Sequence, residues 1–406
     1  MQSGDKQKIL YLCGTKIHPA TTGGFLHTTG IARTLARAGH EVCLYSFAGR
    51  AEDYRLRGPR RETIAVEPNL YEDVHLGLGI GLLQSANRRL GYPRRWQYEM
   101  LRRGRVPNRL KQALSQASLV LADSAFVPPV PGPRQDTPWI LVSHNLEHRL
   151  LEQGSPPERR SAAWMRRVEA AAPQAFHDIF ACTEEDQAFF RQHDSSGSRK
   201  LPIVGSGVDA AAYASPPGTR ERMRAELGLG DEDSLLIFGG SKSWQNIDAL
   251  ERLQAHASDQ AEFLRKQRVH FLLLGSIADQ PYRQGPFIAT GRVGEVAPFF
   301  AASDAGINPV MKGSGANTKI YEYMAARLPV VSTPFGMRGS NLNPDEDYLP
   351  YEDGPGLRAA LERLLHERDR TQWRAFADAL WQRESARCDI GEMVRRAFAQ
   401  LPELGV

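Results

Sequence analysis

Residues 313–339 read GSGANTKIYEYMAARLPVVSTPFGMRG. The glycines at the start predict a turn, and the apolar residues Ile320, Met324 and Ala325 then recur at the spacing of a helix. After Arg327 the pattern becomes that of a buried strand, LPVVST. The stretch therefore predicts a loop, a helix, a short turn and a strand in succession.

Lys319 and Glu322 stand three residues apart on this predicted helix and share one face, close to a helix N-terminus with unpaired backbone N–H groups. Backbone amides and a lysine suit a diphosphate, and a carboxylate suits a pair of sugar hydroxyls. The face therefore fits a sugar nucleotide. The alternative is a solvated Lys–Glu pair on an ordinary helix, and this helix alone leaves both interpretations open.

The first half of the chain begins with a predicted strand over residues 8–13, a glycine-bearing loop over 14–24, a helix over 25–38 and a second strand over 42–46. This order is a βαβ unit, which predicts a parallel sheet with helices on both faces. Residues 210–233 are rich in proline, glycine and charge and predict a linker, after which a similar pattern starts again. With 406 residues, the chain suits two α/β domains.

A dense polar cluster, SHNLEHR at residues 143–149, follows the buried strand predicted over 139–142. In open α/β sheets ligands bind at the carboxyl ends of the strands, so this position favours a site role for His144. A lone histidine is otherwise more often structural. The chain shows neither the G-x-G-x-x-G spacing of a nicotinamide site nor a Cys/His cluster with the spacing of metal ligands.

The apolar and charged fractions are those of a soluble globular protein, and four well-separated cysteines predict reduced thiols. Without a long apolar run or a signal-peptide pattern, the expected location is cytoplasmic. Residues 88–111 hold nine basic side chains, one acid and several aromatics. This indicates either a patch that faces a membrane or a polyanion, or an ordinary solvated face. No nucleic-acid module accompanies it, so no nucleic-acid partner is expected.

The whole pattern resembles the GT-B glycosyltransferases, and more narrowly the large retaining group known as family 4, or glycosyl transferases group 1. The most specific match is the motif GSG-x-x-x-KI-x-E-x-MA-x-x-x-PVVST over residues 313–333. The supporting matches are Gly23-Gly24, His144-Asn145-x-Glu147, Gly207-Val208-Asp209 and Gly291-Arg292-Val293.

This resemblance covers nearly the full length and implies an α/β fold of the GT-B type. Two Rossmann-like, doubly wound domains would face a central cleft, and a C-terminal helix would cross back to the first domain. The implied domains are an N-terminal acceptor-binding domain over residues 1–205, a nucleotide-sugar-binding domain over 206–380 and the returning helix over 381–406.

The resemblance also implies a donor site. Glu322 would hold the ribose, His144 would lie near the transferred sugar, and Lys319 would meet the charge on the leaving group. His144 and Lys319 are therefore the candidate catalytic residues. The other candidate donor-binding residues are Gly23, Gly24, Ser241, Lys242, Arg292, Val293, Ser314, Gly315, Ala316, Asn317 and Thr318.

Three positions depart from the family pattern. Ser314 stands where members with a paired-glutamate motif carry the first glutamate. Gly240 and Gln245 stand where many members carry an arginine and a lysine for the diphosphate. The cations left to meet the charge of the leaving group are Lys319, Lys242 and Arg292.

The expected activity is transfer of a sugar, with retention, from a nucleotide sugar to a glycan, lipid-linked or polypeptide acceptor, with UDP-sugars favoured. In this class the leaving phosphate oxygen takes the acceptor's proton in a front-face attack, so no protein nucleophile, metal or other cofactor is expected. The alternatives are a sugar-nucleotide epimerase on the same fold and a non-catalytic nucleotide-sugar-binding protein. A peripheral contact with the inner face of the membrane is expected through Arg88 to Lys111.

Overall fold

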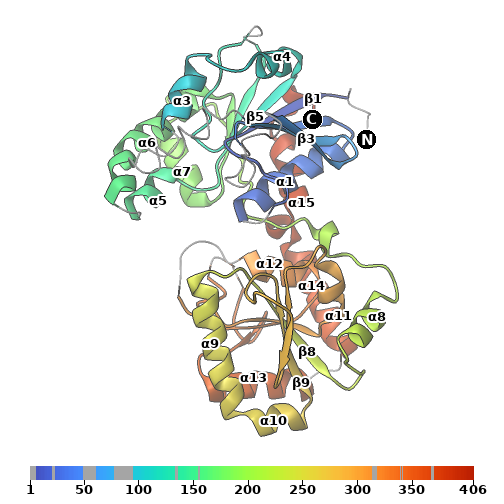
Figure 1. Ribbon diagram of the computed structural model, residues 1–406. Helices are drawn as coiled ribbons and strands as arrows, with labels where there is room; N and C mark the ends of the chain where they lie inside the picture. Colours follow the sequence, from blue (N-terminus) through green and yellow to red (C-terminus); the bar gives the residue numbers. More distant parts are fainter. Residues whose placement is uncertain are drawn as a thin grey trace. The chain divides into compact units, whose positions relative to one another are not determined.

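The computed structural model describes residues 6–20, 23–48, 61–76, 95–132, 136–153, 156–312, 318–338, 340, 342–366 and 370–406. The chain divides into two compact units. The first unit holds residues 1–206 together with 390–406, and the second holds residues 207–389. Each unit is built around its own sheet of seven strands (Figure 1).

The first sheet is parallel except at one edge, where β3 runs antiparallel to β4. Its hydrogen-bonded order places β2 on one side of β1 and β5 on the other. In this order the strands are β3 (Arg61–Glu67), β4 (Leu70–His75), β2 (Glu41–Ser46), β1 (Lys8–Cys13), β5 (Leu119–Asp123), β6 (Trp139–Val142) and β7 (Asp178–Phe180).

Successive side chains of β1 point to opposite faces of this sheet. Ile9 and Tyr11 join a core that includes side chains of α1 (Gly23–Arg37) and α15 (Ile390–Ala399). Leu10 and Leu12 join the core on the other face. The helices that contribute to that second core are α3 (Arg95–Arg102), α4 (Asn108–Gln116), α6 (Pro156–Ala175) and α7 (Glu184–His193), and α5 (Glu147–Gln153) packs against α6.

The second sheet repeats the plan, with β9 on one side of β8 and β12 on the other. Only its edge strand β10 pairs in an antiparallel manner among the described strands. In spatial order the strands are β10 (Tyr282–Gln284), β11 (Phe287–Gly291), β9 (Val269–Leu274), β8 (Ser234–Gly239), β12 (Ala305–Asn308), β13 (Val330–Ser332) and β14 (Leu349–Pro350).

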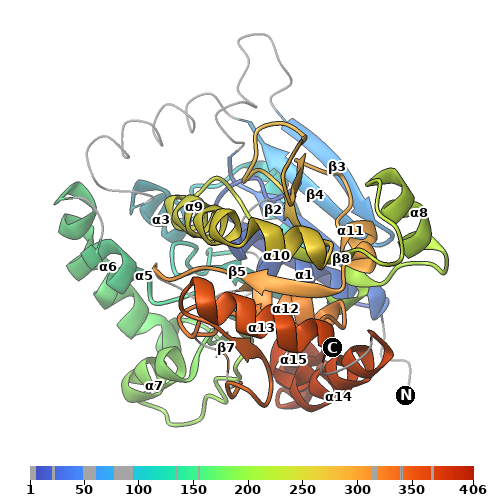
Figure 2. The same ribbon diagram turned by 90° about the horizontal axis from the view of Figure 1, so that it is seen from below.

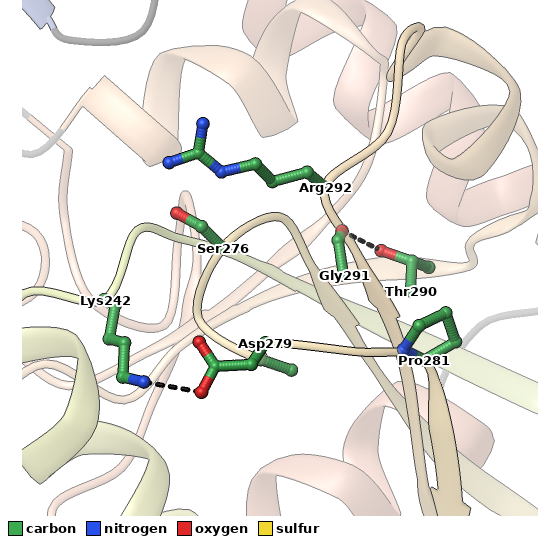
Figure 3. Close-up of a pocket in the computed structure, with 8 residues that line it drawn as sticks. Lys242, Ser276, Asp279, Pro281, Thr290, Gly291 and Arg292 are labelled. Atoms are coloured by element: carbon green, nitrogen blue, oxygen red, sulfur yellow. Dashed lines mark hydrogen bonds and ion pairs between the residues drawn. The ribbon is translucent and has the colours of Figure 1, made fainter. Parts of the chain in front are cut away.

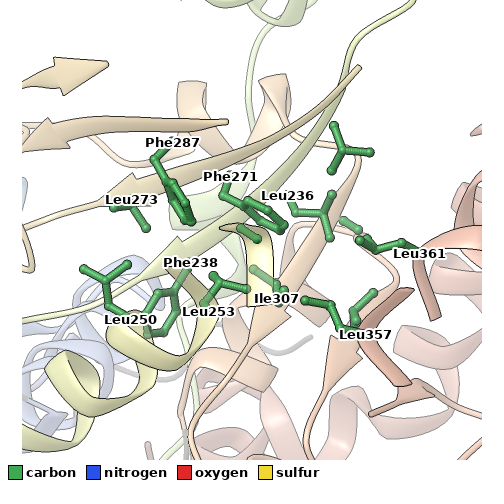
Figure 4. Close-up of a cluster of buried hydrophobic side chains, with 14 of the residues drawn as sticks. Leu236, Phe238, Leu250, Leu253, Phe271, Leu273, Phe287, Ile307, Leu357 and Leu361 are labelled. Carbon is green, nitrogen blue, oxygen red and sulfur yellow. The ribbon is translucent and has the colours of Figure 1, made fainter. Parts of the chain in front are cut away.

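Helices cover both faces of the second sheet. On one face, α9 (Trp244–Asp259), α10 (Ala261–Lys266) and α13 (Gly354–His366) pack over the apolar cluster drawn in Figure 4. Figure 2 shows α10 and α13 beside α9. The other face carries α8 (Thr219–Glu226), α11 (Ala297–Ala302), α12 (Thr318–Ala325) and α14 (Arg370–Cys388), together with the short 3-10 helix η2 (Ala210–Tyr213).

The predicted βαβ opening and the restart of the pattern in the second half are confirmed. The predicted linker over 210–233 is wrong, because η2 and α8 fold as part of the second unit. The buried Arg224 of α8 donates hydrogen bonds to the carbonyl of Ala302 and to Asp304. A charge-rich sequence therefore packs by pairing its charges rather than by an apolar period.

The C-terminal segment also differs from the expected division. Residues 381–389 lie in the second unit, because Trp381 and Cys388 are buried in its core. The segment that returns to the first unit begins at Ile390, whose side chain lies in the first core. The four cysteines, all within the described residues, form no disulfide bond.

Glycine at position 306 permits the close packing of α12 on β12. A Cβ at Gly306 would lie 2.2 Å from the ring of the buried Tyr323 on α12. The hydroxyl of Tyr323 donates a hydrogen bond to the carbonyl oxygen of Ile307 at 2.9 Å. The missing side chain on β12 and the ring on α12 thus fix where this helix lies.

We expect Gly306→Ala to lower the free energy of unfolding by about 1–3 kcal/mol, because the added methyl group overpacks the contact with Tyr323. Chemical denaturation followed by circular dichroism measures this change. Gly294→Ala is the matched control, since a Cβ there meets nothing within 4 Å. Equal stability of the two variants would contradict the packing argument.

Candidate functional site

The candidate site in the second unit lies at the carboxyl ends of its strands. The strand order reverses beside β8, since the chain continues to β9 on one side and later returns to β12 on the other. In open α/β sheets such a switch point is where ligands bind. The side chains of α12 and the loops after β8, β9 and β11 meet at this edge.

Helix α12 carries Lys319 and Glu322 to the end of β8. Glu322 Oε2 lies 3.8 Å from the position that a Cβ would take on Gly239, the last residue of β8. Lys319 Nζ lies 5.8 Å from the centroid of the Phe238 ring. Both side chains belong to partly exposed residues, so they are removed from most of the solvent but remain reachable.

Burial shifts the acid–base equilibria of this pair in opposite directions. Loss of solvent raises the pKa of the Glu322 carboxyl group, against the opposing effects of Lys319 and of a hydrogen bond with Tyr213. Loss of solvent lowers the pKa of Lys319, and Glu322 opposes that change. Burial therefore disfavours the charged form of each side chain. A negatively charged ligand group beside Lys319, or hydroxyl groups beside Glu322, would offset this free-energy cost.

Tyr213 is a site residue that the sequence analysis missed. It ends η2, and its ring packs edge-to-face on Phe300 with the centroids 4.9 Å apart. Burial and the nearby Glu322 raise the pKa of Tyr213 well above its ordinary value, so its hydroxyl keeps its proton and donates a hydrogen bond to the carboxylate of Glu322. The only signal in the sequence is its position four residues after the Gly207-Val208-Asp209 match.

A pocket of about 380 Å³ lies at the same edge of the sheet (Figure 3). Two of its lining residues, Lys242 and Arg292, are candidate donor-binding cations. Lys242 Nζ lies 2.6 Å from Asp279 Oδ2, and both side chains are exposed. The other lining residues are Ser276, Ala278, Pro281, Thr290 and Gly291. Hydroxyl groups and cations together suit a phosphate-bearing ligand.

The loops after β8 and β9 approach each other closely beside this pocket. The backbone N–H of Ile277 donates to the carbonyl oxygen of Gly240 at 3.0 Å. Gly275 has a φ of +98°, and a Cβ there would lie 2.9 Å from the same oxygen. Only glycine fits this conformation and this approach at position 275, so Gly275 shapes the loop beside the pocket.

The remaining candidate donor-binding residues of the second unit occupy the same edge or lie outside the described residues. Ser241 is exposed in the loop after β8, and Val293 is partly buried against the core. Thr318 begins α12. Ser314, Gly315, Ala316 and Asn317 lie outside the described part of the chain.

In the first unit, His144 follows β6 and lies in a chain of hydrogen bonds. Its Nε2 lies 2.7 Å from Asp123 Oδ1 at the end of β5, and its Nδ1 lies 2.9 Å from Nδ1 of His27 on α1. His27 and Asp123 were not predicted from the sequence. Asp123 ends a buried strand, and His27 lies one turn into a helix that begins with two glycines. In the sequence alone, neither position is a strong signal for a functional residue.

Candidate residues Gly23 and Gly24 open the same helix α1. A Cβ at Gly24 would meet nothing within 4 Å, so the backbone there borders open space. The helix has no acidic residue in its first turn. Its positive end is therefore not neutralised by its own sequence.

The buried carboxylate of Glu169 on α6 fixes the segment that follows His144. It accepts the backbone N–H of Glu147 at 2.6 Å and lies 2.6 Å from Nδ1 of His148. Burial raises the pKa of Glu169 to about 7, although these hydrogen bonds favour its ionised form. Hydrogen bonds from α6 thus fix the backbone of the polar cluster that follows β6.

Among the residues that the structure describes, no group of three or more His, Cys, Asp or Glu side chains could hold a metal ion. Within the same residues, no helix is long and apolar enough to cross a membrane.

Comparisons with known proteins agree on the fold. Residues 233–367 match the family model of glycosyl transferases group 1, and no curated protein matches the chain. Among solved structures, HepE from Anabaena in complex with UDP-glucose has a TM-score of 0.59 at 16% identity, covering 98% of this chain and 100% of HepE. Sucrose-phosphate synthase from Thermosynechococcus elongatus has a TM-score of 0.58 at 15% identity, covering 98% and 99%. WaaG, a glycosyltransferase involved in lipopolysaccharide biosynthesis, has a TM-score of 0.57 at 15% identity, covering 96% and 98%.

The two sheets and these structural likenesses define the GT-B fold. Residues 233–367, which carry Lys319, Glu322 and the pocket of the second unit, match the model of the glycosyl transferases group 1 family. The chain therefore has the GT-B fold, and its second unit carries a match to a glycosyltransferase family.

We expect Glu322→Gln to leave stability unchanged or to raise it by up to about 1 kcal/mol at neutral pH. Because the pKa of Glu322 is raised, the folded chain binds this proton more tightly than the unfolded chain does. Ionised Glu322 therefore lowers stability as the pH rises through its raised pKa. Thermal unfolding measured from the ordinary pKa of glutamate, about pH 4, upward tests this, and a loss above about 2 kcal/mol would mark Glu322 as structural.

Proposed function

We propose that the chain transfers a sugar from a UDP-sugar, with retention, to a glycan, lipid-linked or polypeptide acceptor. The observation that carries this proposal is the pair Lys319 and Glu322 at the switch point of the second sheet. Partial burial of a carboxylate, oriented by Tyr213, and of a lysine lowers the stability of the fold, because burial disfavours both charges. Such a pair is therefore better explained by a function than by stability. Their chemistry suits the ribose and the diphosphate of a nucleotide.

In the proposed complex, Glu322 accepts hydroxyl groups of the ribose, and Tyr213 holds the carboxylate in place. Lys319 meets the charge that develops on the departing diphosphate, with Lys242 and Arg292 at the neighbouring pocket. Preorganised donors of this kind are worth about 3–4 kcal/mol each in a site that excludes water. The bond between the anomeric carbon and the phosphate oxygen breaks, the acceptor oxygen bonds to that carbon on the same face, and the departing phosphate oxygen takes the acceptor's proton, so no metal or other cofactor is needed.

The choice of UDP rests on similarity. HepE is described in complex with UDP-glucose, and a trehalose-phosphate synthase from Burkholderia vietnamiensis is described as UDP-forming. Both share the fold of this chain at TM-scores of 0.59. A sugar-nucleotide epimerase and a non-catalytic nucleotide-sugar-binding protein remain the alternatives, and turnover distinguishes them from a transferase.

We expect a UDP-sugar to raise the thermal stability of the chain, whereas GDP-, dTDP- and CMP-sugars raise it less. A ligand at a hundred times its dissociation constant adds about 2.7 kcal/mol of stability. Glu322→Ala should abolish the shift while the variant stays folded. Glu362→Ala is the matched control, because Glu362 is an exposed acid on α13 of the same unit, paired with Arg358.

No shift with any UDP-sugar, or a shift that survives Glu322→Ala, would contradict the assignment of the donor site. A shift that is unchanged by EDTA is expected if binding needs no metal.

We further propose that the first unit makes a peripheral contact with anionic lipid at the cytoplasmic face of the membrane. Tyr98 on α3 packs edge-to-face on Trp164 of α6, with the centroids 5.4 Å apart, and the guanidinium of Arg95 lies 5.4 Å from the Trp164 ring. Along α6, exposed arginines recur seven residues apart and so share a face: Arg159, Arg160, Arg166 and Arg167. Aromatic and basic side chains in this arrangement suit a negative lipid surface. Residues 88–94 of the predicted basic stretch lie outside the described residues.

We expect the chain to sediment with vesicles that contain phosphatidylglycerol and not with pure phosphatidylcholine vesicles. Each basic residue near such a surface contributes about 1 kcal/mol, so replacing both Arg166 and Arg167 by glutamine should weaken binding roughly thirtyfold. The same double replacement at Arg395 and Arg396, exposed on α15, is the matched control with the same change in charge. Equal losses in both double variants would mean that the surface of α6 has no special role.

A further inference from the structure

The chain of hydrogen bonds around His144 contains three short contacts. The first joins Asp123 Oδ1 to His144 Nε2 at 2.7 Å, and the second joins His144 Nδ1 to His27 Nδ1 at 2.9 Å. The third joins His27 Nε2 to the carbonyl oxygen of Val204 at 3.0 Å. Each contact is a hydrogen bond only if one of its two atoms carries a hydrogen. The number of hydrogens in the chain can therefore be counted.

The count begins at Val204, because a carbonyl oxygen cannot donate. His27 Nε2 must carry the hydrogen of the third contact. Burial, followed by the nearby His144, lowers the pKa of His27 to about 3, so this ring is neutral and carries only one hydrogen. His27 Nδ1 is then an acceptor, and His144 Nδ1 must donate in the second contact.

The first contact needs one more hydrogen, which lies either on His144 Nε2 or on Asp123. Asp123 Oδ1 also accepts the hydroxyl of Thr28 at 2.8 Å, as an ionised carboxylate does well. Free imidazole holds a proton about 2.6 pH units more tightly than free aspartate. Both side chains retain some solvent contact, with 15% of His144 and 12% of Asp123 exposed, so the ion pair is not in a dry interior. The extra hydrogen therefore belongs on the ring.

We infer that His144 is held as a doubly protonated imidazolium by Asp123 on one side and His27 on the other. Tyr11 and Cys13 on β1 also face Asp123, and burial raises the pKa of both, so neither adds a negative charge. His27 and Asp123 act as positioning residues, which fix the charge and the orientation of the ring.

This state gives His144 a definite chemistry. A ring with a hydrogen on each nitrogen has no lone pair and cannot serve as the general base that takes the acceptor's proton. It offers a fixed positive charge at the carboxyl edge of the first sheet, suited to a phosphate-bearing ligand. The inference on the ligand rests on the proposed function.

The test is the protonation state of His144 in the full-length chain, read from ring ¹⁵N shifts in long-range ¹H–¹⁵N correlation spectra at about pH 8, well above the pKa of free histidine. His144→Gln identifies the signals. We expect both nitrogens of His144 to show the shifts of an imidazolium, and Asp123→Asn to convert the ring to the neutral form. A neutral His144 in the wild-type spectrum overturns the inference, whether or not the variant folds.

A UDP titration of the same samples separates this inference from the proposed function. His193→Gln on α7 is the histidine control and should change neither result. An imidazolium in a chain that does not bind UDP would contradict the proposed function alone, whereas UDP binding by a chain with neutral His144 would contradict the inference alone.

Discussion

The absence of a side chain at position 306 is the constraint on which the donor site depends. It lets the ring of Tyr323 lie directly on β12, where its hydroxyl bonds to the backbone of Ile307. This contact sets the position of α12, and the same helix presents Lys319 and Glu322 at the end of β8. A short helix of eight residues has little stability of its own, so its packing decides where the functional side chains lie.

The two units use the same edge of a parallel sheet in different ways. In the second unit, a cation and a carboxylate are partly withdrawn from water, and each keeps its charge against the cost of burial. In the first unit, the charge at the sheet edge comes from a histidine between a carboxylate and a second histidine. Each arrangement provides preorganised charge, which the proposed transfer from an anionic donor would use.

The sequence predicts those parts of the fold that depend on local apolar periodicity. The strands over residues 8–13 and 139–142 are confirmed to the residue, because each is largely buried and is mostly a run of apolar residues. The hairpin of β3 and β4 was missed, since β3 is largely exposed at the edge of the sheet and carries polar residues. The helix α8 was read as a linker because the pairing of Arg224 with Asp304 joins segments distant in sequence.

The same limit applies to the site. Lys319 and Glu322 stand in one motif, so their shared face could be predicted, whereas Tyr213 and His27 reach their partners only through the fold.

The most direct test of the account is the rate of UDP release from a UDP-sugar by the purified chain with a panel of acceptors. We predict acceptor-dependent release whose kcat falls far more than its KM rises in Lys319→Ala, because this lysine acts on the charge that develops in the transition state. Release that is absent with every UDP-sugar, or that is unaffected by loss of Lys319, would contradict the account.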